Sequence, residues 1–431
     1  MSETPIVGEN SSLATEIPLS DQEQKQPVTL GFQLLLSLAN VVVWLAIIPV
    51  QQLLLPLQIS VIDPVNKVSG LSLLLFATGV TGAISPPLVG AWSDRTSSRF
   101  GRRRTWIVAG TVLAILTFIL MANANSLVGL VIEAALYGFV MGMILSAVLA
   151  IIPDRVPVSQ RATVSAFAGL AQPVGIVIGT ILIAQVIRSI QGSYYTIASI
   201  LLVVLTIFVL VVHERPLPKE EVPPFSFRDF AVNFFSPLRS RDFALTWGGR
   251  FMVILAQTTL AEFMLFYLKD VIHYDRLFPG QAAEQGFAMF QVIQTVCVVV
   301  ATIISGIISD RIQRRKPFVI AASLIMTVAL LLIAFIPSWT IVLVTAVIFG
   351  IGLGIFLSTD IALSTQVLPQ AKNRGKDLGL ITSANVLPEL LFPVISFVAF
   401  GIFHGYTALF IIAAIATFAG ALFIAPIKSV R

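Results

Sequence analysis

About a dozen apolar runs, each roughly 20 residues long, alternate with short polar segments along this chain. A helix needs about 20 residues to cross the ~30 Å hydrocarbon core of a bilayer. Backbone at that depth must satisfy its own hydrogen bonds, which favours helices, whereas barrel strands are about 10 residues long with alternating polarity. Only 11% of the residues are charged, against about 25% in soluble domains. The sequence therefore predicts an all-α integral membrane protein.

We predict twelve transmembrane helices, an even number that places both termini on one side of the membrane. The predicted spans are Leu30–Leu55, Val68–Trp92, Trp106–Ala124, Leu127–Ile152, Val164–Ile187, Tyr194–Val212, Ala244–Leu268, Gly286–Ser309, Phe318–Ile336, Thr340–Leu363, Leu378–Phe403 and Ala408–Ile424.

Positive charge is distributed unequally between the two sides of this topology. The two tails and the loops on their side hold 22 lysines and arginines, and the opposite loops hold only Lys67, Arg188, Lys269 and Arg276. Because cytoplasmic loops carry the excess of Lys and Arg, we expect a multi-pass protein of the cell membrane with both termini in the cytoplasm. This placement also explains the net charge of +5 without a nucleic-acid partner.

Two polar segments suggest the domain boundaries. Residues 1–29 lack the basic start and apolar core of a signal peptide, and we expect a disordered cytoplasmic tail. Residues 214–243 are rich in proline and charge and end in an aromatic–arginine mixture, which is typical of a cytoplasmic linker with an interfacial piece. The linker separates two six-helix halves, residues 30–213 and 244–431.

The two halves contain landmarks separated by one constant offset of 216 residues. The matched pairs are Gly90 and Gly306, Asp94 and Asp310, Arg95 and Arg311, Gly138 and Gly354, and Pro153 and Pro369. Such a parallel repeat of two six-helix halves is the arrangement of one large class of transporters.

The loop copies "GAWSDRTSSRFGRRR" and "GIISDRIQRRK" are predicted to form conformational latches. Their glycines allow a neighbouring helix to approach closely, and their aspartates can pair with an arginine of the same loop. The alternative is that the arginines only set the topology. The latch candidates are Gly90, Asp94, Arg95, Gly101, Arg102 and Arg103 in the first copy, and Gly306, Asp310 and Arg311 in the second.

The pattern "GxxxDR…GRR" between the second and third spans resembles the signature of the major facilitator superfamily, and the resemblance covers the whole chain. Three extra residues in "DRTSSRFGRRR" make this loop similar to those of the glycoside–pentoside–hexuronide cation symporters and the sucrose–proton symporters. The resemblance implies a secondary transporter with alternating access, and more narrowly a sugar–proton symporter.

A competing resemblance lies in "GLAQPVGIVIG", residues 169–179. This stretch is similar to the "GPxxGG" motif of proton-driven drug exporters, but Gln172 stands where that motif has glycine. Gly175 and Gly179 also form a small-xxx-small pair, which indicates close helix packing instead.

Charged residues at membrane depth are costly and mark functional sites by default. The candidates for proton coupling are Asp360, Arg250, Glu262, Glu133 and Glu389. The resemblance implies that spans one, four, seven and ten line a central cavity, and four of the five residues lie on those spans.

Arg250 and Asp360 lie at a similar depth near the cytoplasmic side. We hypothesise that they pair in the empty site, because an unpaired buried charge is far more costly, and that protonation of Asp360 releases Arg250; a fixed structural pair is the alternative. Glu262 and Glu133, in the outer third of their spans, can accept a proton from outside or line a hydrated cavity. Glu389, beside Pro388, can face the cavity or satisfy backbone groups that the proline leaves free.

Neutral polar residues within the spans are candidates for substrate binding, because amides both donate and accept hydrogen bonds and the indole of Trp247 or Trp44 can stack on a sugar ring. Helix packing is the alternative for each of them. The candidates are Asn40, Gln172, Trp247, Gln257, Gln291, Gln294 and Asn385.

Other classes of function find little support. The chain has no "GxxxxGK[ST]" loop and no "HExxH" motif, and its one cysteine, Cys297, allows no paired-cysteine metal site. We expect no enzyme activity, cofactor or metal, a proton gradient as the energy source, and a monomer with a small-molecule substrate in a lipid bilayer. Three functions remain open: a proton-coupled importer of a sugar or small polar solute, a proton-driven exporter of drugs or amphiphiles, and a lipid mover or sensor. A cavity lined by Gln and Asn favours the first, and one lined by aromatic residues and Met favours the second.

Overall fold

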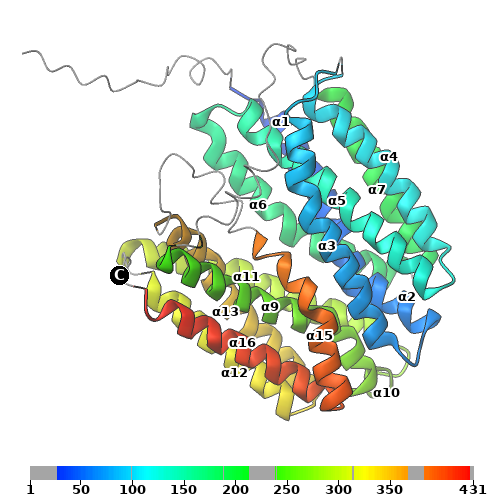
Figure 1. The fold of residues 1–431 in the computed structure, drawn as a ribbon, viewed down its shortest axis with the longest axis vertical. Helices are drawn as coiled ribbons and strands as arrows, with labels where there is room; N and C mark the ends of the chain where they lie inside the picture. Colours follow the sequence, from blue (N-terminus) through cyan, green and yellow to red (C-terminus); the bar gives the residue numbers. More distant parts are fainter. Residues whose placement is uncertain are drawn as a thin grey trace, which may run out of the picture.

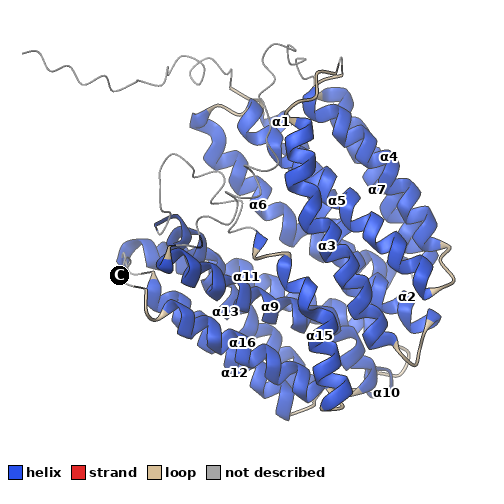
Figure 2. Cartoon of the chain, viewed as in Figure 1, coloured by secondary structure: helices blue, strands red, loops and turns tan. Residues whose placement is uncertain are grey.

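The computed structural model describes residues 27–98, 100–187, 189–212, 238, 240–312, 315–366 and 383–427, without the side chains of residues 158, 162, 310 and 361–366. Every regular element within these ranges is a helix, as Figure 2 shows. The predicted all-α class is therefore confirmed. Residues 1–26 of the predicted tail and residues 214–237 of the predicted linker lie outside the described residues, as does Pro369 of the repeat.

The first half begins with one continuous helical stretch that contains a π-helical segment, Val50–Leu54, between α1 and α2. The helices of this half are α1 (Leu30–Pro49), α2 (Leu55–Ile62), α3 (Lys67–Ser93), α4 (Arg102–Ala122), α5 (Leu127–Arg155), α6 (Val158–Ile181) with a π-helical extension Leu182–Ile187, and α7 (Ile190–Val211).

The second half repeats this arrangement with a short additional helix after its first span. Its helices are α9 (Arg241–Asp270), α10 (Tyr274–Leu277), α11 (Ala283–Ile312), α12 (Lys316–Phe335), α13 (Trp339–Gln366), a 3-10 segment Leu387–Leu391, α15 (Phe392–Ser396), a π-helical segment Phe397–Ile402, and α16 (Tyr406–Ile424).

Eleven helical stretches in the described residues are long and apolar enough to cross a membrane. Most of them extend beyond the predicted spans: α6 begins at Val158 rather than Val164, and α9 begins at Arg241 rather than Ala244. The apolar pattern marks only the part of a helix at hydrocarbon depth, and backbone hydrogen bonding continues into the polar ends.

The predicted eleventh span differs most from its prediction. Residues 378–382 lie outside the described residues, and the remainder is a shorter apolar stretch, Leu387–Ile402, of mixed helix type. Pro388 and Pro393 explain the irregularity, because proline removes a backbone donor and its ring clashes with the preceding turn. The regular helix predicted up to Phe403 is therefore wrong in form, although the apolar segment itself is present.

Local capping fixes several helix starts on short polar loops. The side-chain oxygens of Thr29, Ser126 and Ser189 accept hydrogen bonds from the backbone N–H groups of Phe32, Gly129 and Gly192, respectively. These bonds satisfy donors that the first turn of a helix would leave unpaired.

The repeat of the sequence is visible in how the helices pack. A Cβ added at Gly138 of α5 would lie 2.5 Å from the carbonyl oxygen of Thr78 in α3, and one added at Gly354 of α13 would lie 2.5 Å from that of Val298 in α11. Both glycines therefore allow the same backbone approach in the two halves.

Gly90 and Gly306 do not have the predicted packing role. Each lies inside its helix rather than at its end, and an added Cβ would meet its nearest neighbour at 3.8 Å and 3.9 Å, which is ordinary contact. The close backbone approach of the paired helices occurs at Gly138 and Gly354 instead.

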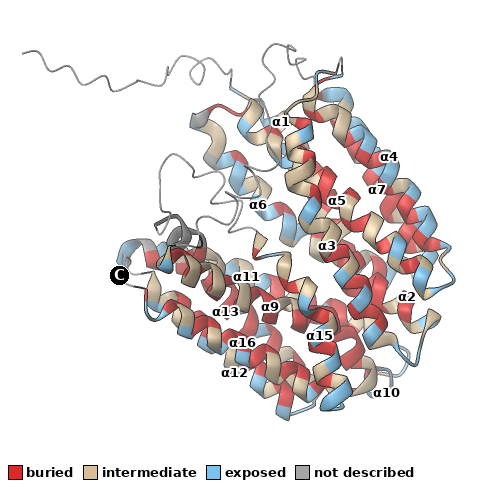
Figure 3. Ribbon diagram, in the orientation of Figure 1, coloured by how far each residue is buried: buried red, intermediate tan, exposed pale blue. Residues whose placement is uncertain are grey.

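The two halves form two groups of helices that meet near α2, α10 and α15 and diverge toward the other end (Figure 1). That other end carries the α3–α4 loop with its arginines, and we refer to it as the arginine-rich end. Buried residues lie between the helices, and exposed residues lie mainly on the outward-facing sides (Figure 3). Many of the exposed residues are apolar, among them Leu116 and Val203. Such a surface suits lipid rather than water.

Candidate functional site

A cavity of about 330 Å³ lies between the two halves at mid-depth of the bundle. Helix α6 of the first half and α9, α11 and α13 of the second half line it. Four of the predicted substrate-binding residues meet there, and we refer to the site as the glutamine cavity: Gln172, Gln257, Gln291 and Gln294. Thr295 and Thr302 add hydroxyl groups to the same wall.

Helical periodicity explains why these residues converge. Gln291, Gln294, Val298 and Thr302 follow the three- and four-residue steps that keep side chains on one face of α11. The predicted common face of Gln291 and Gln294 is thus confirmed. The Gln291 side chain is buried, with 6% of its residue surface exposed. Its Oε1 atom has no hydrogen-bond partner among the described residues. An unsatisfied buried acceptor beside a cavity indicates a place for a ligand or water.

The ion pair predicted between Arg250 and Asp360 is present. Nη1 of Arg250 donates to Oδ2 of Asp360, and both side chains are buried. Nε and Nη2 of Arg250 both donate to Oδ1 of Asn385, at 3.2 and 3.1 Å. Three segments of the second half therefore surround one guanidinium group, and Oδ1 of Asp360 has no partner among the described residues.

The ion pair and the cavity lie on the same two helices, α9 and α13, and the ion pair is nearer to the arginine-rich end. Arg250 and Gln257 are seven residues apart in α9, and Asp360 follows Leu353 and Leu357 of the cavity wall by seven and three residues in α13. Seven residues correspond to about two turns and ~10 Å of helix. The pair is therefore displaced from the cavity toward the arginine-rich end, and the two sites share α9 and α13.

Two of the predicted substrate residues belong to this charged region rather than to the glutamine cavity. Asn385 contacts Arg250, as described above. Trp247, one turn from Arg250, stacks on Phe251 with ring centroids 5.4 Å apart. Neither residue lines the glutamine cavity.

Asn40 lies apart from both groups. Its side chain is fully buried in α1, where Nδ2 donates to the carbonyl oxygen of Leu36 at 2.9 Å, and Oδ1 has no partner among the described residues. Trp44 and Val41 of the same helix contact Gly175 so closely that an added Cβ would lie 2.6 Å from the carbonyl oxygen of Val41. The packing interpretation of Gly175 and Gly179 is thus confirmed.

The three glutamates of the sequence prediction occupy different surroundings. Glu262 is 3% exposed and lies close enough to Gln52 of the other half and to Glu389 to interact with both. Glu389 packs against Gly79 of α3, where an added Cβ would lie 2.7 Å from the Glu389 Cβ. Glu133 is half-buried near the N-terminal end of α5, away from the cavity. Glu262 and Glu389 thus lie where the two halves meet.

The first copy of the predicted latch forms an ion-pair network. Arg103 donates from Nη2 to Asp94 Oδ1 at 2.5 Å and from Nε to Asp154 Oδ2 at 2.9 Å, and Arg102 donates to the same Asp154 oxygen at 2.6 Å. Arg95, which follows the end of α3, donates from Nη1 to the carbonyl oxygen of Ala91 in the last turn of that helix. These ion pairs join α3, α4 and α5 of the first half.

Gly101, which precedes α4, has a positive φ of 98°, a backbone conformation that glycine adopts without strain. In the second copy of the latch, Arg311 is exposed and the side chain of Asp310 lies outside the described residues. The second latch therefore stays a prediction.

Asp154 and three residues at the opposite end were missed at the sequence level. Asp154 follows the landmark Pro153, and its position beside a repeated motif is a signal that identifies it in retrospect. Lys67 of α3 pairs with Asp270 of α9 at 2.5 Å, and Tyr406 of α16 donates to the same carboxylate. Lys67 entered the sequence interpretation only as one of four positive charges on the outer side.

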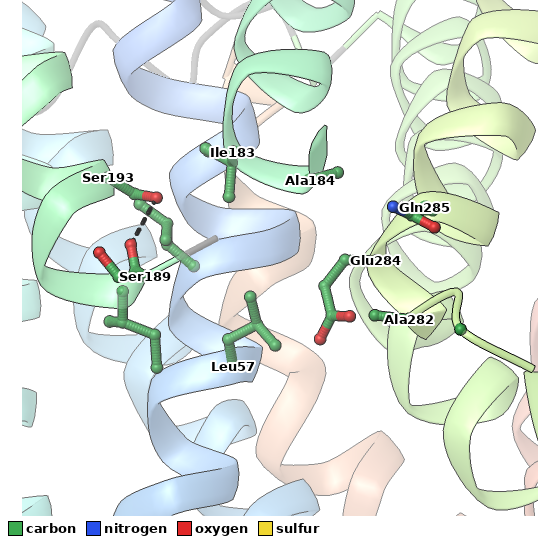
Figure 4. A pocket seen from close by; sticks show the side chains of 11 residues that line it. Leu57, Ile183, Ala184, Ser189, Ser193, Ala282, Glu284 and Gln285 are labelled. Atoms are coloured by element: carbon green, nitrogen blue, oxygen red, sulfur yellow. Dashed lines mark hydrogen bonds between the residues drawn. The ribbon is translucent and has the colours of Figure 1, made fainter. Parts of the chain in front are cut away.

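A second cavity, of about 340 Å³, lies toward the opposite end and is shown in Figure 4. Two of its polar side chains already have partners: Ser193 Oγ donates to the carbonyl oxygen of Ser189 at 2.9 Å, and Glu284 pairs with Lys269 at 2.7 Å. The remaining wall includes Leu57, Ile183 and Ala184. This cavity therefore offers a ligand fewer free polar groups than the glutamine cavity.

No group of three or more His, Cys, Asp and Glu residues that could hold a metal ion occurs in the part of the chain that the structure describes. The charged clusters above combine carboxylates with guanidinium groups instead. Charge-assisted hydrogen bonds between these groups are shorter and stronger than neutral ones.

A family model described as Major Facilitator Superfamily matches residues 30–296 and 281–430. The AmpG 4 protein of Rickettsia conorii, named as a transporter, is 26% identical over 196 residues, which are 42% of this chain and 47% of that protein. The matched region thus spans about half the length of that relative. The human proton-associated sugar transporter A is 43% identical over 56 residues, which are 13% of this chain and 8% of that protein.

Solved structures of transporters share the fold. The nucleoside transporter NupG superimposes with a TM-score of 0.76 at 13% identity, covering 92% of this chain and 100% of that chain. A POT family transporter solved with a conjugated peptide gives a TM-score of 0.71 at 15% identity, covering 92% and 95% of the two chains.

Proposed function

The chain belongs to the major facilitator superfamily, and on that basis we propose that it is a proton-coupled symporter of a neutral sugar or similar small polar solute. In this proposal the solute binds in the glutamine cavity and the two halves expose it alternately to the two sides of the membrane. The proposal requires no resident cofactor or metal. Its partners are the solute, the proton gradient and the bilayer, and one chain is the working unit.

The observation that carries the proposal is the chemistry of the glutamine cavity. Four amide side chains from three helices and two halves can donate and accept hydrogen bonds at once, as hydroxyl groups of a sugar require. No charged, aromatic or methionine side chain is among the described residues that line it. The lining therefore favours a neutral polyol over an ion or a lipophilic cation. Leu353, Leu357 and Val298 supply apolar contacts for the C–H faces of a ring.

The ion pair below the cavity supports the proposed coupling. Protonation of Asp360 removes the charge that holds Arg250, and a buried arginine that loses its carboxylate must find new partners. Because α9 and α13 carry both the ion pair and the cavity wall, a shift of Arg250 acts directly on the helices that bind the solute. The name of the human relative, which joins proton and sugar, supports the same coupling.

The charge distribution supports the orientation in the membrane. The arginine-rich end faces the cytoplasm under the positive-inside rule, which places both termini there. The two halves meet at the opposite, outer end (Figure 1). On this orientation the described conformation faces the cytoplasm.

A second candidate is a proton-driven exporter of amphiphilic compounds. The observation that favours it is the apolar remainder of the cavity wall, which includes Leu170, Pro173 and Ile176 of α6. Such a wall fits the apolar part of an amphiphile.

The test is transport by the purified full-length chain in liposomes with an imposed pH gradient. We expect an acidic exterior to accelerate uptake of at least one neutral sugar from a panel that also contains lipophilic cations. Gln257→Leu and Gln294→Leu should raise KM about tenfold or more, since each removes polar contacts from the cavity. Gln185→Leu is the matched control, because Gln185 is exposed and lies outside this cavity. Gradient-driven movement of lipophilic cations alone would contradict the sugar proposal and support the exporter.

A further inference from the structure

We propose that Lys67, Asp270 and Tyr406 form an outer gate, a reversible ion-pair contact that keeps the two halves closed on the outer side while the cavity faces the cytoplasm. The word outer rests on the membrane orientation given under the proposed function. The contact between the halves does not depend on which solute is carried.

The gate joins the two halves through one carboxylate. Lys67 is the first residue of α3 in the first half, and Asp270 is the last residue of α9 in the second half. Lys67 Nζ lies 2.5 Å from Asp270 Oδ1, and the hydroxyl of Tyr406 donates to Asp270 Oδ2 at 2.5 Å. Both oxygens of the carboxylate are therefore engaged, one across the boundary between the halves and one within the second half.

The helix dipoles disfavour the positive charge of Lys67 and the negative charge of Asp270 at the helix ends where they lie. The N-terminal end of a helix carries partial positive charge and the C-terminal end partial negative charge. Lys67 lies at an N-terminal end and Asp270 at a C-terminal end, so each charge is unfavourable for its own helix. Pairing across the halves compensates both, which indicates that the contact between the halves, rather than helix capping, accounts for these residues.

Aromatic contacts position the gate. The ammonium group of Lys67 lies 5.1 Å from the centroid of the Phe266 ring, one turn before Asp270 on α9, where the ring face attracts a cation. Tyr406 packs edge-on against Tyr267 and Phe400, with centroid distances of 5.8 and 4.8 Å. Lys67 therefore has two partners in the other half, and Tyr406 holds the carboxylate ready on its own side.

The partial exposure of the pair suits a contact that must open. The side chains of Lys67 and Asp270 are 22% and 31% exposed. Water can reach both groups, so separation does not leave an unsolvated charge as it would in a buried pair. A partly exposed pair of this kind biases an equilibrium between closed and open states modestly rather than locking it.

The neighbouring pair Lys269–Glu284 provides a matched control. Lys269 precedes Asp270 on α9, and its Nζ lies 2.7 Å from Glu284 Oε1 at the start of α11. Both residues belong to the second half. The two pairs therefore share their depth and chemistry, but only Lys67–Asp270 crosses between the halves.

The test measures the distance between the halves with spin labels on the full chain in lipid nanodiscs. The labels are attached at cysteines replacing Val61 and Leu277, which are exposed and lie at the outer end of the first and second half, in a Cys297→Ser background. We expect Lys67→Asp to raise the ratio of long to short distances about two- to fivefold. The double variant Lys67→Asp with Asp270→Lys should restore the original distribution, and Glu284→Ala should leave it unchanged.

Two results would overturn the gate: a distribution unaffected by Lys67→Asp, or an equal shift with Glu284→Ala. Lys67→Met, which keeps the length of the side chain without its charge, replaces Lys67→Asp if the latter does not give a monodisperse protein. The distances are recorded without solute, so failure of the gate is distinguishable from failure of the sugar proposal.

Discussion

Arg250 donates two hydrogen bonds, from Nε and Nη2, to the single oxygen Oδ1 of Asn385. Its third bond, from Nη1, goes to Asp360. The amide of Asn385 does not titrate, so Arg250 retains an acceptor when Asp360 takes up a proton. Asn385 therefore lowers the free-energy cost of protonating Asp360. Asp360 is thus the switchable partner of Arg250, and Asn385 is the permanent one.

Replacing the switchable partner should uncouple transport from the proton gradient. Asp360→Asn fixes this position in a state like the protonated carboxyl, so we expect gradient-driven uptake to be lost while solute exchange persists. The measurement compares uptake under a pH gradient with counterflow at equal pH on the two sides. Intact gradient-driven uptake in Asp360→Asn would show that the pair is structural.

Giving Arg250 a second, permanently available carboxylate should also reduce coupled uptake, but by holding Arg250 in place rather than by releasing it. Asn385→Asp gives Arg250 a second carboxylate, so protonation of Asp360 no longer releases it. We expect coupled uptake to fall about tenfold, the effect of a change of ~1.4 kcal/mol, with a smaller effect on counterflow. Asn385→Ser is the control, because it also changes the side chain but adds no second carboxylate. Equal losses in both variants would point to packing rather than charge.

Close packing at the repeated glycines should be measurable as stability. An alanine Cβ at Gly138 would lie within 2.5 Å of the Thr78 carbonyl oxygen, whereas one at Gly169 would meet no atom within 4 Å. We expect Gly138→Ala to destabilise the protein by about 1–3 kcal/mol, the usual cost of overpacking, and Gly169→Ala to change little. Thermal unfolding in detergent compares the two, and similar midpoints would contradict the packing argument.

Much of the fold followed from the sequence because hydrocarbon thickness fixes the length of a spanning helix and the 216-residue offset reveals the repeat. The Arg250–Asp360 pair was predictable for a related reason: two charges at equal depth in an apolar interior have few alternatives to each other. That the four glutamines meet in one cavity could not be derived from the sequence, since the side of each helix that faces the cavity depends on how the helix packs against its neighbours. The contact of Lys67 with Asp270 was equally hidden, because the two residues are 203 positions apart and both lie just outside the predicted apolar spans, where hydropathy gives no information on depth.

The latch at the arginine-rich end makes a last prediction about arginine geometry. Arg103 uses Nε for Asp154, Nη2 for Asp94 and Nη1 for Ser93, so it holds residues of α3 and α5 from one guanidinium group. Lysine is a point charge and cannot bind three acceptors in this fixed fork. We therefore expect Arg103→Lys to lower both the unfolding midpoint and the transport rate, and Asp154→Asn to lower them in the same way. Arg311→Lys, at an exposed residue in the last turn of α11 in the second half, should change neither. A tolerated Arg103→Lys would mean that these arginines act through charge alone, as topology determinants.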